Sequence, residues 1–246
     1  MLPNIFKPKH LYKLIRLGSN HDGGYLVGYN SIFKSKFLIS LGIEANWDFE
    51  KQFQKKNNKV KTICYDVQTN FKFILKNILI SFVLIKWNLM FFYIKQLLKY
   101  PFFFHKNKLI KKFISQNKDL DQIIEDKNNV FIKIDIEGSE YRILESLIKN
   151  NKKINGLVIE FHDVDLHLEK IISFIKKINL DLVHIHANNY IYDSDNWKKN
   201  YICPPCLELT FEKNPEIENS TYIHPHRFDQ PNDKYSKEIY LEFNTN

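Results

Sequence analysis

The 246-residue sequence has few of the residues that mark a disulfide scaffold or a dinucleotide site. It contains three cysteines and seven glycines, and no G-x-G-x-x-G segment. The missing fingerprint argues against binding of a dinucleotide pyrophosphate. An odd number of cysteines argues against a disulfide framework. Cys203 and Cys206 flank two prolines, which remove backbone donors where a redox motif normally opens a helix.

The sequence also has little arginine, no leader-like start and no long uncharged apolar run. Three arginines and no recognisable binding motif argue against nucleic acid as a partner. The first residues, MLPNIFKPKH, lack an apolar core and a small-residue cleavage site, so a cytoplasmic location is expected. Residues 71–104 are strongly apolar, but lysines divide them into runs shorter than the roughly 20 residues of a spanning helix.

The formal net charge of +8 is unevenly distributed. Fourteen lysines and a single acid, Asp66, lie between Lys51 and Phe113, whereas the rest of the chain has more acidic than basic residues. A basic region beside an acidic body predicts an anionic partner, either a phosphorylated or nucleotide-linked substrate or an acidic lipid surface. A solvated lysine face without a partner is the alternative.

Strand-like and helix-like segments alternate along most of the chain. Strands are expected at 37–41, 60–65, 130–136, 156–161, 180–185 and 207–211, and helices at 45–54, 120–126, 139–149 and 166–178. This alternation predicts an α/β fold with a doubly wound, mostly parallel sheet. The length and the 44% hydrophobic content suffice for one compact domain over residues 1–246.

Residues 71–113 interrupt the alternation as an apolar and basic helical insertion. Its polar residues recur at spacings of four and seven, which places them in one stripe of a long helix; they are Asn77, Ser81, Asn88, Lys95 and Lys99. The apolar remainder of such a helix must be covered. The insertion is therefore expected to be a lid over the substrate pocket, a homodimer contact or a peripheral membrane contact.

Polar residues follow five of the expected strands. The carboxyl ends of parallel strands meet at one edge of a sheet, where open α/β sheets bind ligands. One such residue alone could cap a helix or be a satisfied core residue. Together they predict a functional site made of Gly42 and Glu44, Asp66, Asp135 and Glu137, Glu160, His162 and Asp163, and His184, His186, Asn188 and Asn189.

A single glycine after the first strand and an acid after the second favour a ligand with a ribose but no phosphate. S-adenosylmethionine is such a ligand. Asp66 would accept hydrogen bonds from the ribose hydroxyls, and the Gly42 turn would let the backbone approach the methionine part. Asp135 or Glu137 would stabilise the cationic sulfonium or ammonium group.

Two histidines at adjacent strand ends, His162 and His186, are candidates for a general base. His162 is favoured because Glu160 or Asp163 could orient its imidazole; the alternative is that both histidines hydrogen-bond substrate. A magnesium ion that polarises a hydroxyl could be held by oxygen ligands. The candidate ligands are Asp135, Glu137, Glu160 and Asp163.

Six segments, taken in order, resemble the FkbM-type S-adenosylmethionine-dependent methyltransferases. They are RLGSNHDGGY at 16–25, IDIEGSE at 134–140, IEFH at 159–162, HIHANN at 184–189, LELTF at 207–211 and DQPN at 229–232. The resemblance implies a class I methyltransferase (Rossmann-like) fold, a seven-stranded sheet whose last strand is antiparallel. It places Asp22 and Gly23 with Glu44 among the cofactor-binding residues. The first loop, LGIEAN, departs from the glycine-rich loop of the family.

The resemblance also implies O-methylation of sugars or other secondary-metabolite hydroxyls, including those of bacterial surface glycans. The predicted acceptor is a hydroxyl of a saccharide or of a phosphorylated, nucleotide-linked group in a capsule or O-antigen polysaccharide. The residues expected to bind it are Glu160, Asp163, His184, Asn188 and Asn189. The alternative function is a catalytically silent scaffold that docks an anionic membrane or a partner protein through the insertion.

Overall fold

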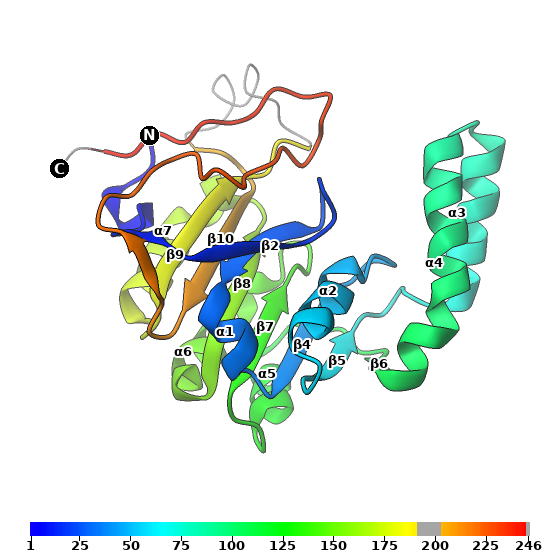
Figure 1. The fold of residues 1–246 in the computed structure, drawn as a ribbon, viewed down its shortest axis with the longest axis horizontal. Coiled ribbons are helices and arrows are strands. Elements are labelled where there is room, and N and C mark those ends of the chain that lie inside the picture. Colours follow the sequence, from blue (N-terminus) through cyan, green and yellow to red (C-terminus); the bar gives the residue numbers. More distant parts are fainter. Residues whose placement is uncertain (191–202, 245–246) are drawn as a thin grey trace.

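The computed structural model describes residues 1–190 and 203–244 (Figure 1). The prediction of one domain over residues 1–246 includes 191–202 and 245–246, which lie outside the described residues.

Seven strands form the central sheet in the order β6-β5-β4-β7-β8-β10-β9. Neighbouring strands from β6 to β8 are parallel, and β10 is antiparallel to both β8 and β9. The predicted doubly wound sheet with an antiparallel last strand is confirmed. The strands are β4 (Phe37–Leu41), β5 (Lys61–Tyr65), β6 (Lys108–Ile110), β7 (Val130–Ile134), β8 (Ile154–Phe161), β9 (Asp181–Ala187) and β10 (Leu207–Glu212).

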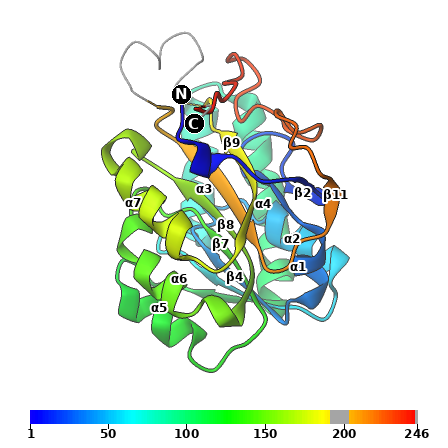
Figure 2. The same cartoon turned by 90° about the vertical axis from the view of Figure 1, so that its left-hand side faces the viewer.

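Helices cover both faces of the sheet (Figures 1 and 2). One face carries α1 (Tyr29–Lys34) and α2 (Asp48–Lys56), and the other carries α5 (Asn117–Ile124), α6 (Leu144–Lys149) and α7 (Val164–Lys177). The helix expected at 139–149 divides into a 3-10 turn, η2 (Glu140–Arg142), and α6. Further 3-10 turns are η1 (Asn4–Phe6) and η3 (Asn151–Lys153).

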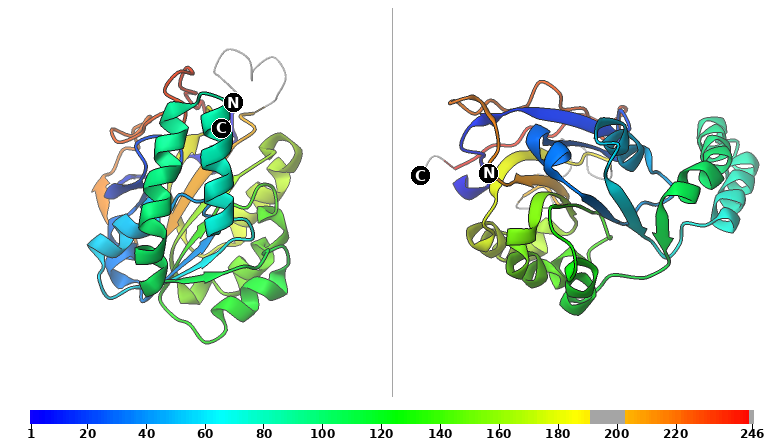
Figure 3. Two further views of the ribbon diagram at one scale, coloured as in Figure 1. Left: turned by 90° about the vertical axis from the view of Figure 1, so that its right-hand side faces the viewer. Right: turned by 60° about the horizontal axis from the view of Figure 1, so that its bottom comes forward.

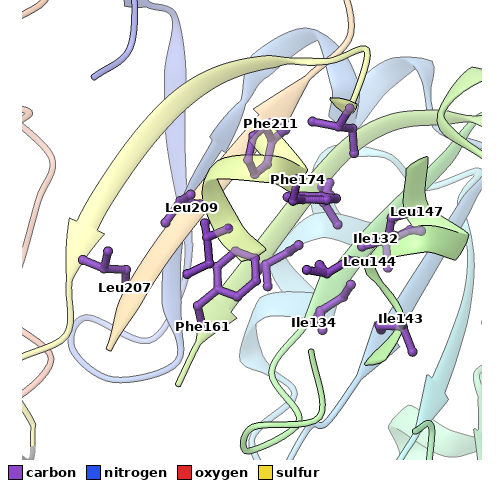
Figure 4. Packing of buried hydrophobic residues seen from close by; sticks show 14 of the residues in the cluster. Ile132, Ile134, Ile143, Leu144, Leu147, Phe161, Phe174, Leu207, Leu209 and Phe211 are labelled. Atoms are coloured by element: carbon purple, nitrogen blue, oxygen red, sulfur yellow. The ribbon is translucent and has the colours of Figure 1, made fainter. Parts of the chain in front are cut away.

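Aromatic side chains fill both layers between helices and sheet. On the α7 side, the ring of Phe174 lies 5.5 Å from that of Phe211 and 6.3 Å from that of Phe161 (Figure 4). On the α2 side, the ring of Phe53 lies 4.9 Å from that of Phe131 in β7. Because both faces are covered, the central strands are buried along their whole length, which explains their nearly continuous apolar sequences.

Short strands that the sequence did not predict lie outside the main sheet. A hairpin of β2 (Leu14–Gly18) and β3 (Gly24–Gly28) packs on the sheet, and Thr210 Oγ1 donates a hydrogen bond to Leu26 O, 2.6 Å away. The pair β1 (Leu11–Tyr12) and β11 (Ile217–Asn219) joins the two ends of the chain.

The insertion is a helical hairpin and not one long helix. It consists of α3 (Phe71–Val83) and α4 (Trp87–Lys106), and the turn between them contains Ile85 with φ of 55°. The hairpin stands beside the β6 edge of the sheet (Figures 1 and 3). Its base packs through Phe103, whose ring stacks on Trp47 at 5.8 Å. Within the described residues, no helix has the length and apolar character needed to cross a membrane.

Candidate active site

A tight turn after β4 brings two strand ends together. Gly42 has φ of 76°, and a Cβ at this position would lie 1.7 Å from the carbonyl oxygen of Asp135, which follows β7. Both facts require glycine here. The backbone therefore makes the close approach that the sequence predicted for this turn.

The carboxylate of Asp66, after β5, fixes that turn from the other side. Its Oδ2 accepts hydrogen bonds from the N–H groups of Ile43 and Glu44, both at 3.0 Å. Its Oδ1 accepts from the N–H groups of Gln68 and Thr69, both at 2.7 Å. Four backbone donors occupy the two oxygens, which have about four acceptor positions. Asp66 therefore organises the loops around the ligand site, and its contact with a ribose stays a prediction.

A cavity of about 150 Å³ lies between these loops. Both carboxylates and apolar side chains line it. Its lining includes Gly42, Glu44, Asp66, Asp135 and Glu137, together with Phe113, Ile114 and Ile136. The predicted cofactor residues after β4, β5 and β7 therefore do converge. Glu44 is partly exposed; burial and the charges of Glu137 and Asp135 raise its pKa to about 7.

A buried lysine, Lys133, lies directly beneath the turn. Its Nζ donates a hydrogen bond to the carbonyl oxygen of Gly42 at 2.9 Å and lies 3.7 Å from Asp135 Oδ2. Burial opposes its charge, but Asp135 and the fully buried Glu50 of α2 outweigh burial and raise the pKa of Lys133. This cation was not predicted from the sequence, although a lysine inside the apolar run of β7 was a visible signal.

Tyr25 of β3 joins the carboxylates that follow β7 and β8. Its hydroxyl lies 3.1 Å from Asp135 Oδ2 and 2.8 Å from Glu160 Oε2. Burial, followed by the charge of Asp135, raises the pKa of Glu160 well above its ordinary value. A phenol has one proton, so Tyr25 can donate to only one of these two carboxylates at a time. Asn188 Nδ2 donates to Glu160 Oε1 at 2.8 Å, which fixes this chain.

His162 is surrounded by carboxylates. Its Nδ1 lies 3.3 Å from Glu140, and its Nε2 lies 3.5 Å from Glu137 and 3.8 Å from Glu160. Burial opposes the positive charge, but the Glu140 hydrogen bond and the charge of Glu160 outweigh it and raise the pKa to about 10. An imidazole that keeps its proton at neutral pH is unsuited to the predicted role of general base. Glu140, and not Asp163, orients it.

The second predicted base, His186, is also held as a cation. Its Nδ1 lies 3.5 Å from Glu208 and its Nε2 lies 3.3 Å from Glu238. Burial is again outweighed by these carboxylates, which raise the pKa to about 10. His184 is buried, and its Nε2 lies 2.8 Å from Asp229 Oδ1. Both histidines therefore connect β9 to other parts of the chain.

Of the remaining predicted residues, some stabilise the fold and others lie beside the site. Asn189 is fully buried and its amide donates to three carbonyl groups of the C-terminal segment, so it anchors that segment and not a substrate. Asp163 is exposed at the start of α7. Gly23 faces the Asn46 amide, and the N–H of Asp22 donates to Asn232 O at 3.2 Å. The resembling segments 16–25 and 229–232 thus meet beside the site.

The four oxygen ligands proposed for magnesium do not form one cluster in the described part of the chain. Two groups of three residues could converge on an ion there: Glu160, His162 and Cys206, and Asp135, Glu137 and His162. Both groups need His162, whose proton is held by carboxylates, and neither includes Asp163. The predicted magnesium site is therefore unsupported.

The strand order, the antiparallel strand beside the last parallel one and the ligand site at the carboxyl edge define the class I methyltransferase fold. The family model described as the Methyltransferase FkbM domain matches residues 8–192. The chain belongs to this family. It is a methyltransferase, and S-adenosylmethionine is the methyl donor that the family implies.

Solved structures with a similar fold have low sequence identity. An rRNA methylase from Streptococcus thermophilus is 10% identical, with 75% of this chain and 92% of that chain covered and a TM-score of 0.39. Precorrin-6y C5,15-methyltransferase from Geobacter metallireducens GS-15 is 11% identical, with coverages of 75% and 86% and a TM-score of 0.41. The assignment therefore rests on the family match and the strand order. Comparison with curated proteins gave no match.

Proposed function

We propose that this protein transfers a methyl group from S-adenosylmethionine to a hydroxyl of a saccharide in surface-polysaccharide modification. The observation that carries the proposal is the hydrogen-bonded chain Asp135, Tyr25 and Glu160 beside the cavity at the carboxyl edge. Carboxylate and amide groups at strand ends suit an acceptor with several hydroxyls. Three buried free cysteines support a reducing cytoplasm as its location.

The residues around the cavity fit S-adenosylmethionine. Phe113, Ile114 and Ile136 offer apolar surface for the adenine, and Asp135 and Glu137 offer negative charge for the cationic end. The volume of about 150 Å³ is below the roughly 300 Å³ of typical ligand sites, so the adjoining loops must open to admit the whole molecule. The bound sulfonium supplies an activated methyl group, which leaves the protein to position the acceptor.

Proton removal from the acceptor hydroxyl falls to Asp135 in this proposal. Asp135 is a quarter exposed toward the cavity, with 26% of its side-chain surface accessible, whereas Glu160 is buried. The hydrogen bond from Tyr25 and the nearby Lys133 hold the Asp135 carboxylate in one orientation. This role replaces the histidine base expected from the sequence.

The same carboxylates disfavour a phosphate inside the site, because like charges repel. A phosphorylated or nucleotide-linked acceptor would instead place its anionic part on lysines outside. A groove of about 600 Å³ between α2 and α4 offers Lys51, Lys55 and Lys95 for this purpose, while its Lys99 pairs with Asp48 at 3.5 Å. The sugar would then extend toward the carboxyl edge.

The test combines titration calorimetry with a methyl-transfer assay. Wild-type protein should bind S-adenosylmethionine and S-adenosylhomocysteine and transfer labelled methyl to oxygen in a panel of nucleotide-activated hexoses. Tyr25→Phe should retain cofactor affinity but lower kcat by roughly 10- to 100-fold. Tyr29→Phe, on α1, is the matched control and should be unchanged. No cofactor binding at millimolar concentration, or methylation confined to nitrogen, would contradict the proposal.

A further inference from the structure

The helical hairpin ends in an apolar surface that the other described residues, within 1–190 and 203–244, leave uncovered. We call residues 79–91 the hairpin tip. Its large apolar side chains are mostly exposed to solvent: Val83 is 75% exposed and Ile85 is 69% exposed. The other large exposed side chains of the tip are Leu79, Ile80, Phe82, Leu84, Trp87, Leu89 and Phe91. A contiguous apolar surface of this kind marks an interaction site.

Beyond its base, the hairpin buries two polar side chains fully, whereas its apolar side chains are half-buried or exposed. Ile74 and Phe103 are buried at its base, against the sheet. Beyond the base, the buried residues of the two helices are Ser81 and Gln96, which are 1% and 0% exposed. Small and polar side chains inside, with apolar side chains outside, are typical of helices that pack in lipid. The surroundings that this hairpin fits are therefore apolar.

The positive charge of the hairpin indicates which apolar environment its tip contacts. From Val67 to Lys118 there is no acidic residue; exposed Lys86 lies within the hairpin tip, and further exposed lysines lie along the helices toward the base at 72, 76, 95 and 106. A symmetric dimer would place the same basic surface against itself. An anionic bilayer complements it, since lysines near such a surface contribute about 1 kcal/mol each. Trp87 at the tip is a residue that prefers the membrane interface.

We propose that the hairpin tip inserts shallowly into the surface of an anionic lipid bilayer and anchors the enzyme there. The turn between α3 and α4 stands at the end of the molecule toward which the parallel strands point (Figure 1), as the side view also shows (Figure 3). Docking through the tip therefore turns the carboxyl edge of the sheet toward the membrane. Anchoring itself is independent of the proposed acceptor.

Flotation with vesicles tests this proposal. Wild-type protein should float with vesicles of phosphatidylcholine and phosphatidylglycerol, and less with phosphatidylcholine alone. The double substitution Phe82→Ser with Leu84→Ser should weaken binding roughly 100-fold, because each buried side chain contributes about tenfold. Lys86→Gln should weaken binding to anionic vesicles about fivefold and leave neutral vesicles unaffected. High salt should remove this difference.

The matched control is Leu166→Ser on α7, a leucine that is 73% exposed but lies outside the hairpin. It should bind vesicles like the wild type. Unchanged thermal unfolding and cofactor affinity in all variants show that they fold. Failure of the wild type to float at low salt, or flotation that survives the double substitution, overturns the proposal. A lipid-free dimer that the double substitution dissociates also overturns it, in favour of a second copy of the chain.

Discussion

Replacement of Lys133 by methionine should strongly destabilise the protein through charges that the substitution leaves unpaired. The Lys133 ammonium lies 3.7 Å from Asp135 Oδ2, interacts electrostatically with the fully buried Glu50, and donates to the Gly42 carbonyl oxygen at 2.9 Å. Methionine has a similar length but no charge and no donor. The variant therefore buries a carboxylate without its cation beneath the Gly42 turn.

The expected loss follows from the cost of breaking a buried ion pair, which is about 3–5 kcal/mol. Burial already raises the pKa of Glu50, so this carboxyl can take up a proton and limit the loss. We therefore expect a decrease of about 3 kcal/mol in the free energy of unfolding at pH 8. Because the pKa of Glu50 is higher in the folded than in the unfolded protein, its ionisation destabilises the folded protein as pH rises. The loss of stability caused by Lys133→Met should therefore be smaller at pH 5 than at pH 8.

Urea denaturation of four proteins measures this coupling: wild type, Lys133→Met, Glu50→Gln and the double variant. The double variant should be more stable than Lys133→Met, because Gln removes the unpaired charge. Lys149→Met is the control, since the Lys149 side chain is 70% exposed while it pairs with Asp121 at 2.7 Å; the substitution should change stability by less than about 1 kcal/mol. The reasoning would be refuted if Lys133→Met had the same free energy of unfolding as the wild type. It would also be refuted if the loss in the double variant equalled the sum of the losses in the two single variants.

Two further predictions concern the loops and the histidine. Asp66→Ala removes the acceptor of four backbone N–H groups, so calorimetry should show S-adenosylmethionine affinity reduced by roughly tenfold or more; unchanged affinity would contradict the loop-organising role. Because the pKa of His162 is about 10, kcat/KM should show no acid limb near pH 6.5 that depends on this residue. A limb at that pH which disappears in His162→Gln would identify it as a base after all.

Much of the fold could be predicted from local pattern. Apolar runs such as the one that ends at Asp135 predict buried strands, and their alternation with helical segments predicts a parallel sheet. That alternation also gathers the strand ends at one edge, which is why Gly42, Asp135 and Glu137 were expected together and do line one cavity. The β2–β3 hairpin was missed because its two short strands follow no clear alternation.

Roles within the site depend on partners from distant parts of the chain. Asp66 follows its strand as predicted, yet the four N–H groups around it decide what it can bind. The residues next to His162 in sequence do not show that its pKa is raised. The carboxylate of Glu140, 3.3 Å from its Nδ1, favours the protonated imidazole. The pKa of a side chain depends on burial and on nearby charges, neither of which is a property of neighbouring residues in sequence.

The sequence by itself determined the sheet, its ligand-binding edge and the family. Hydrophobic periodicity and the polar residues that follow each strand are local features of the sequence, and they do not depend on how the elements pack. Tertiary structure decided the rest. It placed Lys133 under the Gly42 turn, joined Tyr25 to two carboxylates, and folded residues 71–106 into a hairpin with Ser81 inside. These outcomes depend on which surfaces meet in three dimensions, and periodicity specifies a face but not its partner.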